Sequence, residues 1–217
     1  SEDYVDGDSE FHSSGGEWRV DNQRLNWEIL DKFKEACTQA GIPETADFNT
    51  GNNEGVGYFK VNQKNGFRWN TSKAFLKPKK KLSNLKIEIN ANVKRILFEG
   101  TKAIGIEFNQ NGVDKKIFAK KETILSAGAI GSPMILQYSG IGPAQLLKKY
   151  SIKVIQDNPQ IGGNLQDHLQ IRCAYKVRGV TTLNSQSNSI WGKFKIGLEY
   201  ALKRSGPLSL SLIHISE

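Results

Sequence analysis

The stretch Leu125–Pro143, LSAGAIGSPMILQYSGIGP, decides how the fold of this chain is interpreted. It follows a strand-like run and encloses one short apolar helix between glycines and prolines. Ser132 and Pro133 predict the start of that helix. A serine hydroxyl can accept a hydrogen bond from a backbone N–H of the first turn, and a proline at the first helical position lacks only an N–H that would have no partner within the helix. Met134–Tyr138 then form the helix, and Gly140 ends it.

The segment Ser126–Ala129 carries no side chain larger than a hydroxymethyl group. It lies at the carboxyl end of a predicted strand, which is where ligands sit in open α/β sheets. Two interpretations follow. The small residues let a planar group approach the bare backbone, or they permit tight packing between strand and helix.

The region 84–126 predicts four strands that lead into this turn. Alternating apolar residues mark the first strand, at Leu85, Ile87 and Ile89 and then at Val93 and Ile96. Asn111 and Gly112 predict a hairpin turn between the next pair. A buried strand then rises to Ser126.

The region before these strands predicts two helices and a loop. Residues 27–40 have apolar residues at helical spacing, with Asn26 as N-cap and Gly41 just past the end, and we expect the apolar stripe to pack in the core. Residues 47–59 are rich in glycine and asparagine and predict a loop. Asn70 or Thr71 can cap a short helix that ends before Pro78.

Composition places the chain among ordinary globular proteins, with 217 residues, 38% hydrophobic and 24% charged. We find no run long enough to span a membrane, no export signal at the start, and no cysteine or histidine spacing typical of a metal site. The net charge of +8 leaves a basic nucleic-acid-binding domain as an alternative. However, only Lys77–Lys86 is densely basic and it has no interleaved aromatic residues, so we predict no nucleic-acid partner.

Two motifs carry a family resemblance. GAIGSPMILQYSGIG, residues 128–142, resembles the second signature of the glucose–methanol–choline (GMC) flavoprotein oxidoreductases, and IGGNLQDHL, residues 161–169, resembles their G-x-N-L-Q-D-H segment. Shorter matches extend over most of the chain: GGEWRV, EGVGYF, GFRWNTSKAFLKP, NANVKRILF, TLNSQSN and GLEYALKRSGPLS. The late matches TLNSQSN and GLEYALKRSGPLS, together with EWRV and WNTSKAFL, look most like the bacterial branch with choline dehydrogenases and related alcohol dehydrogenases.

The resemblance implies FAD as cofactor, with its ADP half against a nucleotide-binding sheet. Val93 resembles the residue whose backbone meets the adenine, while Ala127 and Gly128 resemble the strand-end pair beside the adenosine. We assign no catalytic residue and no metal ligand. His168 belongs to the N-L-Q-D-H passage, and we expect its role to be structural.

The family's G-x-G-x-x-G turn and its catalytic histidine are absent from this sequence, which predicts an internal segment that is inactive alone. A non-catalytic interaction module therefore stays a further alternative. We exclude residues 210–217, SLIHISE with the preceding Leu210, as a non-native tail.

We predict the α/β fold class for the protein, of which this chain is an α+β fragment. Residues 1–168 form the central part of an FAD-binding domain, and residues 169–209 begin an antiparallel-sheet substrate domain, whose roof includes a strand at 169–177. The expected partners are a small alcohol, choline-like or another primary alcohol, and an electron acceptor. For a quaternary ammonium, the residues that could form a cage are Trp69, Tyr58, Phe59 and Glu54, although we favour core or loop packing as the explanation for each. We expect a cytoplasmic protein, or one peripheral to the inner membrane.

Overall fold

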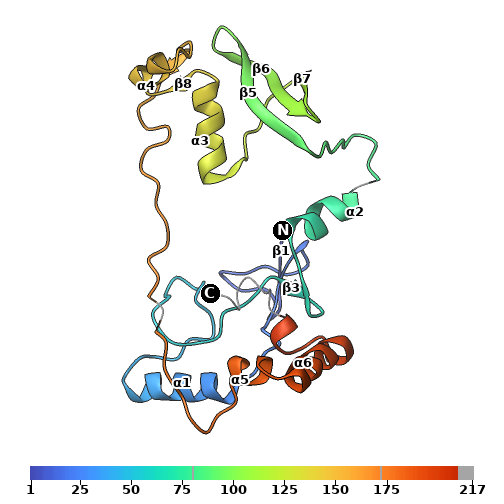
Figure 1. The fold of residues 1–217 in the computed structure, drawn as a ribbon, viewed down its shortest axis with the longest axis vertical. Coiled ribbons are helices and arrows are strands. Elements are labelled where there is room, and N and C mark those ends of the chain that lie inside the picture. Colours follow the sequence, from blue (N-terminus) through green and yellow to red (C-terminus); the bar gives the residue numbers. More distant parts are fainter. Residues whose placement is uncertain (80, 172, 210–217) are drawn as a thin grey trace. The chain divides into compact units, whose positions relative to one another are not determined.

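The computed structural model describes residues 1–79, 81–171 and 173–209, which divide into two compact units. The first unit consists of Ser1–Leu85 together with the chain from Ala174 onward. The second unit is the continuous segment Lys86–Cys173 (Figure 1). All three residues predicted to contact the cofactor lie in the second unit.

The second unit is built on a three-stranded antiparallel sheet with the order β5-β6-β7. Its elements are β5 (Ala91–Glu99), β6 (Lys102–Gln110), β7 (Val113–Phe118), α3 (Gly128–Tyr138), β8 (Ile141–Gly142), α4 (Ala144–Lys149) and β9 (Gln156–Asp157). Asn111 and Gly112 both have positive φ angles, 53° and 83°, as a type I′ turn requires. The hairpin predicted from these two residues is confirmed.

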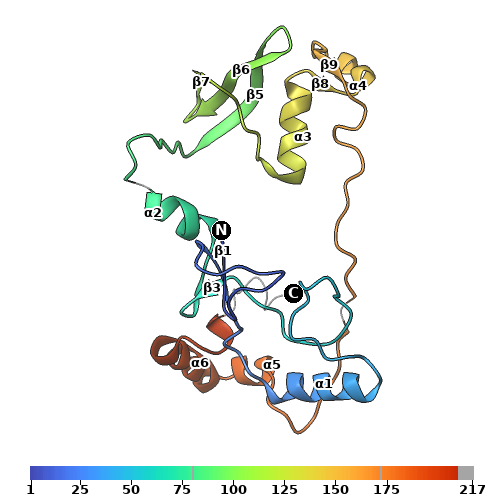
Figure 2. The same ribbon diagram turned by 180° about the vertical axis from the view of Figure 1, so that it is seen from behind.

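Helix α3 packs against β5, and the small core of the second unit forms around this contact. Ile96 and Phe108 from the sheet, Ile135 from α3 and Leu147 from α4 are its buried apolar side chains. Beyond α3, β8 and β9 form a short parallel pair that returns the chain beside the helix end (Figure 2).

In this region the first predicted strand is formed only in its second half, as β5, and the strand predicted to rise to Ser126 is wrong. Residues 85–89 and 121–126 form no strand, and Ile89 and Ile124 are 71% and 79% exposed. A strand requires a hydrogen-bonded neighbour, and no described segment pairs with either run. The alternation of apolar residues indicates a segment that could form a strand, but it does not indicate which other segment would pair with that strand.

The predicted start of the signature helix is also wrong. Helix α3 begins at Gly128, with Ala127 as N-cap, so Pro133 lies inside the helix. The Ser132 hydroxyl accepts a 3.0 Å hydrogen bond from the Ala127 N–H, which precedes the helix, instead of capping a later first turn. Gly140, with φ of 91°, follows the last turn as expected.

The first unit contains two short strand pairs and several helices. Its elements are β1 (Glu2–Tyr4), β2 (Trp18–Val20), α1 (Glu28–Gln39), β3 (Gln63–Lys64), β4 (Phe67–Arg68), the π-helical η1 (Ser72–Leu76), α2 (Lys77–Lys79), α5 (Leu183–Ser187), α6 (Ile190–Lys203) and the 3-10 helix η2 (Pro207–Ser209). Strands β1 and β2 are parallel, and β3 and β4 are antiparallel. The loop predicted at 47–59 has no helix or regular strand, as expected.

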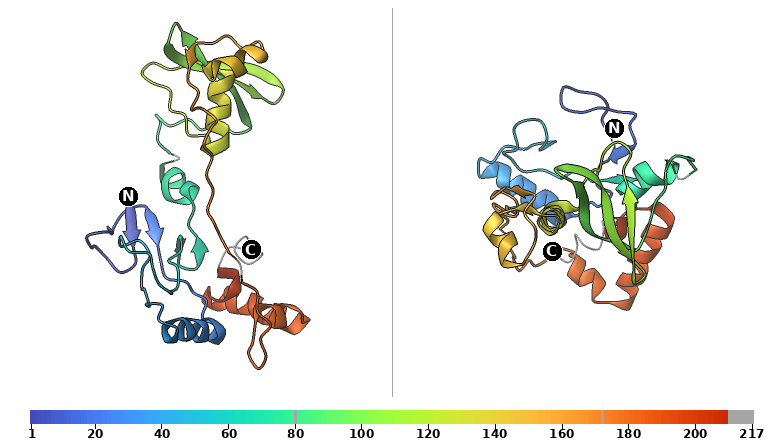
Figure 3. Two further views of the ribbon diagram at one scale, coloured as in Figure 1. Left: turned by 90° about the vertical axis from the view of Figure 1, so that its left-hand side faces the viewer. Right: turned by 90° about the horizontal axis from the view of Figure 1, so that it is seen from above.

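Residues of the late helical region form hydrogen bonds to backbone carbonyls in the early part of the first unit. The Gly206 N–H donates to the Arg24 carbonyl at 2.9 Å, and the Tyr200 hydroxyl lies 3.4 Å from the Gly66 carbonyl oxygen. The rings of Trp18 and Phe75 stack at 5.8 Å between centroids and join β2 to η1. These contacts bring segments far apart in the sequence side by side (Figure 3).

The helices of the first unit differ from prediction in three details. Trp27, not Asn26, is the N-cap of α1, and the apolar stripe of α1 contributes no buried residue, since Phe33 is 54% exposed. Asn70 caps the second helix by accepting from the Lys73 N–H at 3.0 Å, so the asparagine alternative holds. The predicted end before Pro78 is wrong. The π-helical η1 continues directly into α2, which contains Pro78.

The strand predicted at 169–177 is not formed. Its described residues have no regular secondary structure, and Leu169 is 94% exposed. As with the other missing strands, the described part of the chain supplies no neighbouring strand for this run. The boundary proposed at residue 168 between two domains stays a prediction.

Candidate cofactor-binding site

The predicted cofactor residues lie on two elements of the second unit that pack together. Val93 is half-buried on β5, opposite Phe108 of β6. Ala127 and Gly128 are sequence neighbours at the start of α3, and both are exposed. The structure therefore places the pair at one end of the helix that packs against the strand carrying Val93.

The conformation of Gly128 separates the two interpretations of the small residues. Its φ is 83°, in the left-handed region that favours glycine, and apart from its chain neighbours and the backbone of its own helix no described atom lies within 4 Å of where a Cβ would stand. Tight packing therefore does not explain this glycine. It does explain Gly131, whose Cβ would lie 3.2 Å from the Cβ of Ala127.

Ser132 fixes the backbone at this turn. Its hydroxyl accepts a hydrogen bond from the Ala127 N–H, so a side chain of α3 fixes the backbone directly before the helix. The other side stays exposed at Ala127 and Gly128. A flat group can therefore lie against backbone that is both bare and held in place.

Ser139 connects the helix to the strand and was missed by the sequence analysis. Its hydroxyl accepts from the Ile96 N–H at 2.8 Å and lies 2.6 Å from the Ile135 carbonyl, to which it donates. Ile96 follows Val93 by three residues, so this buried contact sets how the Val93 strand meets α3. A serine 43 positions away gives no sequence signal for such a partner.

The Asp167–His168 pair is exposed. The recorded contact between the two residues joins the His168 backbone N–H to an Asp167 carboxylate oxygen at 2.8 Å, which is a local turn interaction. It does not orient the imidazole ring. A structural role for His168 stays our prediction.

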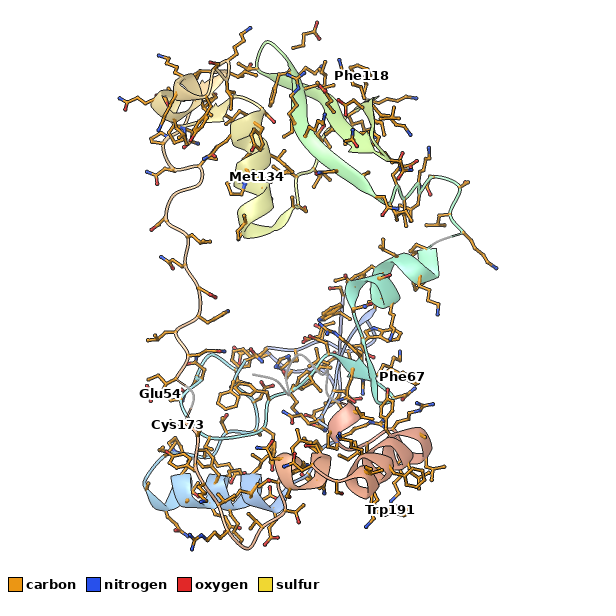
Figure 4. The ribbon with its side chains drawn as sticks, in the orientation of Figure 1. Glu54, Phe67, Phe118, Met134, Cys173 and Trp191 are labelled. Atoms are coloured by element: carbon orange, nitrogen blue, oxygen red, sulfur yellow. The ribbon has the colours of Figure 1, made fainter. Side chains whose placement is uncertain are left out.

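The residues considered for a quaternary ammonium are not assembled into one cage. Phe59 and Trp69 line the same cavity of the first unit. The Tyr58 hydroxyl instead donates to Asp31 at 2.8 Å, and burial, followed by this contact, raises the pKa of Tyr58 to about 12. Glu54 is exposed on the loop (Figure 4).

Comparison with known proteins gives the family. A sequence model of the GMC oxidoreductase family matches residues 10–170. The mitochondrial choline dehydrogenase of Homo sapiens is 41% identical over 200 residues, which is 92% of this chain and 34% of that protein. The oxygen-dependent choline dehydrogenase of Vibrio vulnificus (strain YJ016) is 39% identical over 210 residues, covering 95% of this chain and 37% of the relative.

A solved structure with the same fold is an FAD-dependent oxidoreductase from Chaetomium thermophilum. It has a TM-score of 0.84 and 23% identity, and the match covers 96% of this chain and 39% of that one. The chain belongs to the GMC oxidoreductase family. It spans about a third of the length of the curated relatives it matches.

These matches confirm the predicted family and the mixed α/β fold class of its FAD-binding region. Within the described ranges, no helix is long and apolar enough to cross a membrane. The assignment of Val93, Ala127 and Gly128 to the cofactor stays a prediction.

Proposed function

We propose that this chain forms the adenosine side of the cofactor site in an FAD-dependent oxidoreductase that acts on the CH–OH group of an alcohol. The observation that carries the proposal is the exposed backbone at Ala127 and Gly128, where Gly128 is left-handed and open. Membership of the GMC oxidoreductase family supports it.

The residues present fit the adenosine half of FAD. In this proposal the backbone of Val93 meets the adenine, and the backbone of Ala127 and Gly128 lies beside the adenosine. Ser132 and Ser139 act as positioning residues, because they hold the helix start and the strand without a side chain entering the open surface.

The chemistry of the bound cofactor is hydride acceptance from the alcohol carbon by the flavin ring. The turn G-x-G-x-x-G, which binds a pyrophosphate at a helix N-terminus, does not occur in this sequence. The complete reaction therefore belongs to a protein of family length. Within it, this chain contributes cofactor binding and part of the substrate-covering region from residue 169 onward.

The proposed substrate is choline or another primary alcohol, with an electron acceptor other than a nicotinamide. The support for choline is the similarity to the choline dehydrogenases of Homo sapiens and Vibrio vulnificus. This similarity reports ancestry more than pocket chemistry, because the matching motifs lie away from the reacting carbon.

A chimera tests the proposal. Residues 1–209 replace the matching segment of the Vibrio vulnificus relative, and the purified protein is assayed for bound FAD and for alcohol oxidation with an artificial electron acceptor. We expect a yellow protein that oxidises a primary alcohol. A chimera with native-like near-UV circular dichroism but no bound FAD would overturn the proposal.

A further inference from the structure

The two segments that carry the family resemblance, residues 128–142 and 161–169, meet at Gln137 of α3. Its side-chain amide donates to the Ile161 carbonyl at 3.0 Å, across 24 positions of the sequence. Both residues are half-buried, and in the part of the chain that the structure describes no other side chain of α3 is hydrogen-bonded to residues 159–168. This contact therefore links the two motifs directly.

Two glycines leave the room that the Gln137 side chain occupies. Gly162 has a φ of 84°, and a Cβ there would lie 2.5 Å from the Gln137 amide nitrogen. A Cβ on Gly142 would lie 3.0 Å from the Gln137 Cγ. A larger residue at position 162 would displace the amide and break its bond to Ile161, because the end of a flexible side chain moves more easily than backbone. The first glycine of the G-x-N-L-Q-D-H segment therefore has a physical explanation in this chain.

The return of the chain to the end of α3 does not depend on Gln137. The Asn158 N–H donates to the Gly142 carbonyl at 3.0 Å, and strands β8 and β9 pair just before it. These backbone contacts already bring the chain back. The Gln137 amide adds the position of the residues that follow, from Ile161 onward, and residues 162–168 are exposed.

That position shapes a groove of about 480 Å³ along α3. Ala129 and Ile130, directly after Gly128, line it from the first turn of the helix, and Gly163 and Leu165 line it from the other segment. Ile130 and Leu165 are 71% and 68% exposed, so the groove is open. The groove therefore adjoins the backbone that is proposed to meet the adenosine.

We infer that Gln137 is a positioning residue for the cofactor. By holding Ile161 and Gly162 against α3, it fixes the second wall of the surface on which the adenosine of FAD is proposed to lie. A wall that is in place before binding loses less conformational freedom when the cofactor binds. The Gln137 side chain needs no contact with FAD itself. This inference rests on the proposed function and adds to it the residue that preorganises the site.

FAD titration of the chimera with the Vibrio vulnificus relative, after removal of its flavin, tests this inference through the change in flavin fluorescence. Gln137→Leu keeps the approximate size of the side chain and removes the donor. We expect its dissociation constant for FAD to rise about tenfold, because the wall must then be ordered at the moment of binding.

Asp157→Ala is a control matched for stability. The Asp157 carboxylate accepts from the Ala144 N–H at the start of α4, at 2.9 Å, and Asp157 does not line the groove. Each substitution removes one hydrogen bond from the second unit, so the two melting temperatures should fall by similar amounts. Only Gln137→Leu should weaken FAD binding. Equal FAD affinity of the two variants would show that Gln137 has a purely structural role and would overturn the inference.

Gly162→Ala gives an independent readout. The added methyl group displaces the Gln137 amide, so this substitution should weaken FAD binding when Gln137 is present. In Gln137→Ala the space beside position 162 is free, and the second alanine should add little further loss. Additive losses from the two alanine substitutions would contradict the inference.

Gln137→Glu adds a pH profile that packing alone would not produce. A carboxylate cannot donate to the Ile161 carbonyl, whereas the protonated acid can. The FAD affinity of this variant, relative to that of the unsubstituted chimera, should therefore rise as pH falls from about 8 to about 5, toward the ordinary pKa of a glutamic acid. A ratio that does not change with pH would count against the positioning role.

The unsubstituted chimera separates this inference from the proposed function. If it retains no FAD, the proposed function fails and the inference fails with it. If it binds FAD and Gln137→Leu binds FAD equally well, only the positioning role is wrong. If Gln137→Leu does not fold, the pH profile of Gln137→Glu decides between a positioning and a structural role.

Discussion

The hydroxyl of Ser139, the C-cap of α3, accepts a hydrogen bond from the backbone N–H of Ile96 in β5 at 2.8 Å, and both residues are buried. Strand β5 lies at the edge of its sheet, with β6 on one side. Its outward N–H groups would otherwise lack partners, so a hydroxyl from the packed helix completes one of them. This contact sets the relation between the strand with Val93 and the helix that begins at Gly128.

Ser139→Ala should lower the free energy of unfolding by about 1–3 kcal/mol, because the Ile96 N–H is left buried without an acceptor. Urea unfolding followed by circular dichroism measures the change. Ser126→Ala, at an exposed serine in the same unit, is the control and should be nearly neutral. Equal effects of the two substitutions would show that the Ile96 contact contributes nothing.

Gly128→Val should remove FAD from the chimera with the Vibrio vulnificus relative, because a branched side chain would cover the backbone proposed to meet the adenosine. Valine is also strained at a φ of 83°. Gly112→Val is a matched control, since Gly112 has the same φ and equally open surroundings but lies in the β6–β7 turn.

Bound flavin absorbance per protein measures the outcome of that comparison. The two valine variants should lose similar stability, and only Gly128→Val should lose flavin. Equal flavin loss in both variants would mean that backbone strain alone explains the effect, which would contradict the proposed contact.

The fold was predictable where the signal is local. The Asn111–Gly112 turn and helix α1 follow from neighbouring residues, because turn chemistry and helical periodicity act over a few positions. The strands expected at 85–89 and 121–126 failed because pairing depends on distant backbone. The small residues at Ala127 and Gly128 pointed to an open surface, but Ser139 acquires its role only through a tertiary contact.

Asp47 should make the stability of the first unit depend on pH in the acid range. Burial raises its pKa, but hydrogen bonds from Tyr4 and Asn49 and the nearby His12 outweigh this and leave the pKa below its ordinary value. As pH falls, the Asp47 carboxylate is therefore protonated in the unfolded chain before it is protonated in the folded protein. This contribution is fully present above the unfolded pKa of about 3.9 and is lost as pH falls through the lower folded pKa.

Asp47→Asn should reduce stability at pH 6 and flatten its decline below about pH 5, as measured by urea unfolding across pH. The comparison is Asp114→Asn, whose exposed carboxylate has a pKa lowered by hydrogen bonds from Lys94 and Asn109. Added salt should suppress the smaller effect at Asp114 and leave most of that at Asp47. An unchanged acid slope in Asp47→Asn would contradict this account.

The basic surface should not bind nucleic acid tightly. Lys86 pairs with Glu88 at 2.7 Å, and the densely basic stretch Lys77–Lys86 has no aromatic residues interleaved in its sequence. Fluorescence anisotropy with labelled duplex and single-stranded DNA at physiological salt should show no saturable binding below about 1 μM, where non-specific binding is already weak. Tight binding with a steep salt dependence would favour the nucleic-acid alternative.

The most direct test of the cofactor proposal is a titration of the isotope-labelled 217-residue chain with ADP, followed through backbone amide signals. The proposal predicts weak, saturable shifts at Val93, Ala127 and Gly128, and their loss in Gly128→Val but not in Gly112→Val. Absence of shifts at these three residues, or shifts confined to the first unit, would contradict the central claim that this surface holds the adenosine of FAD.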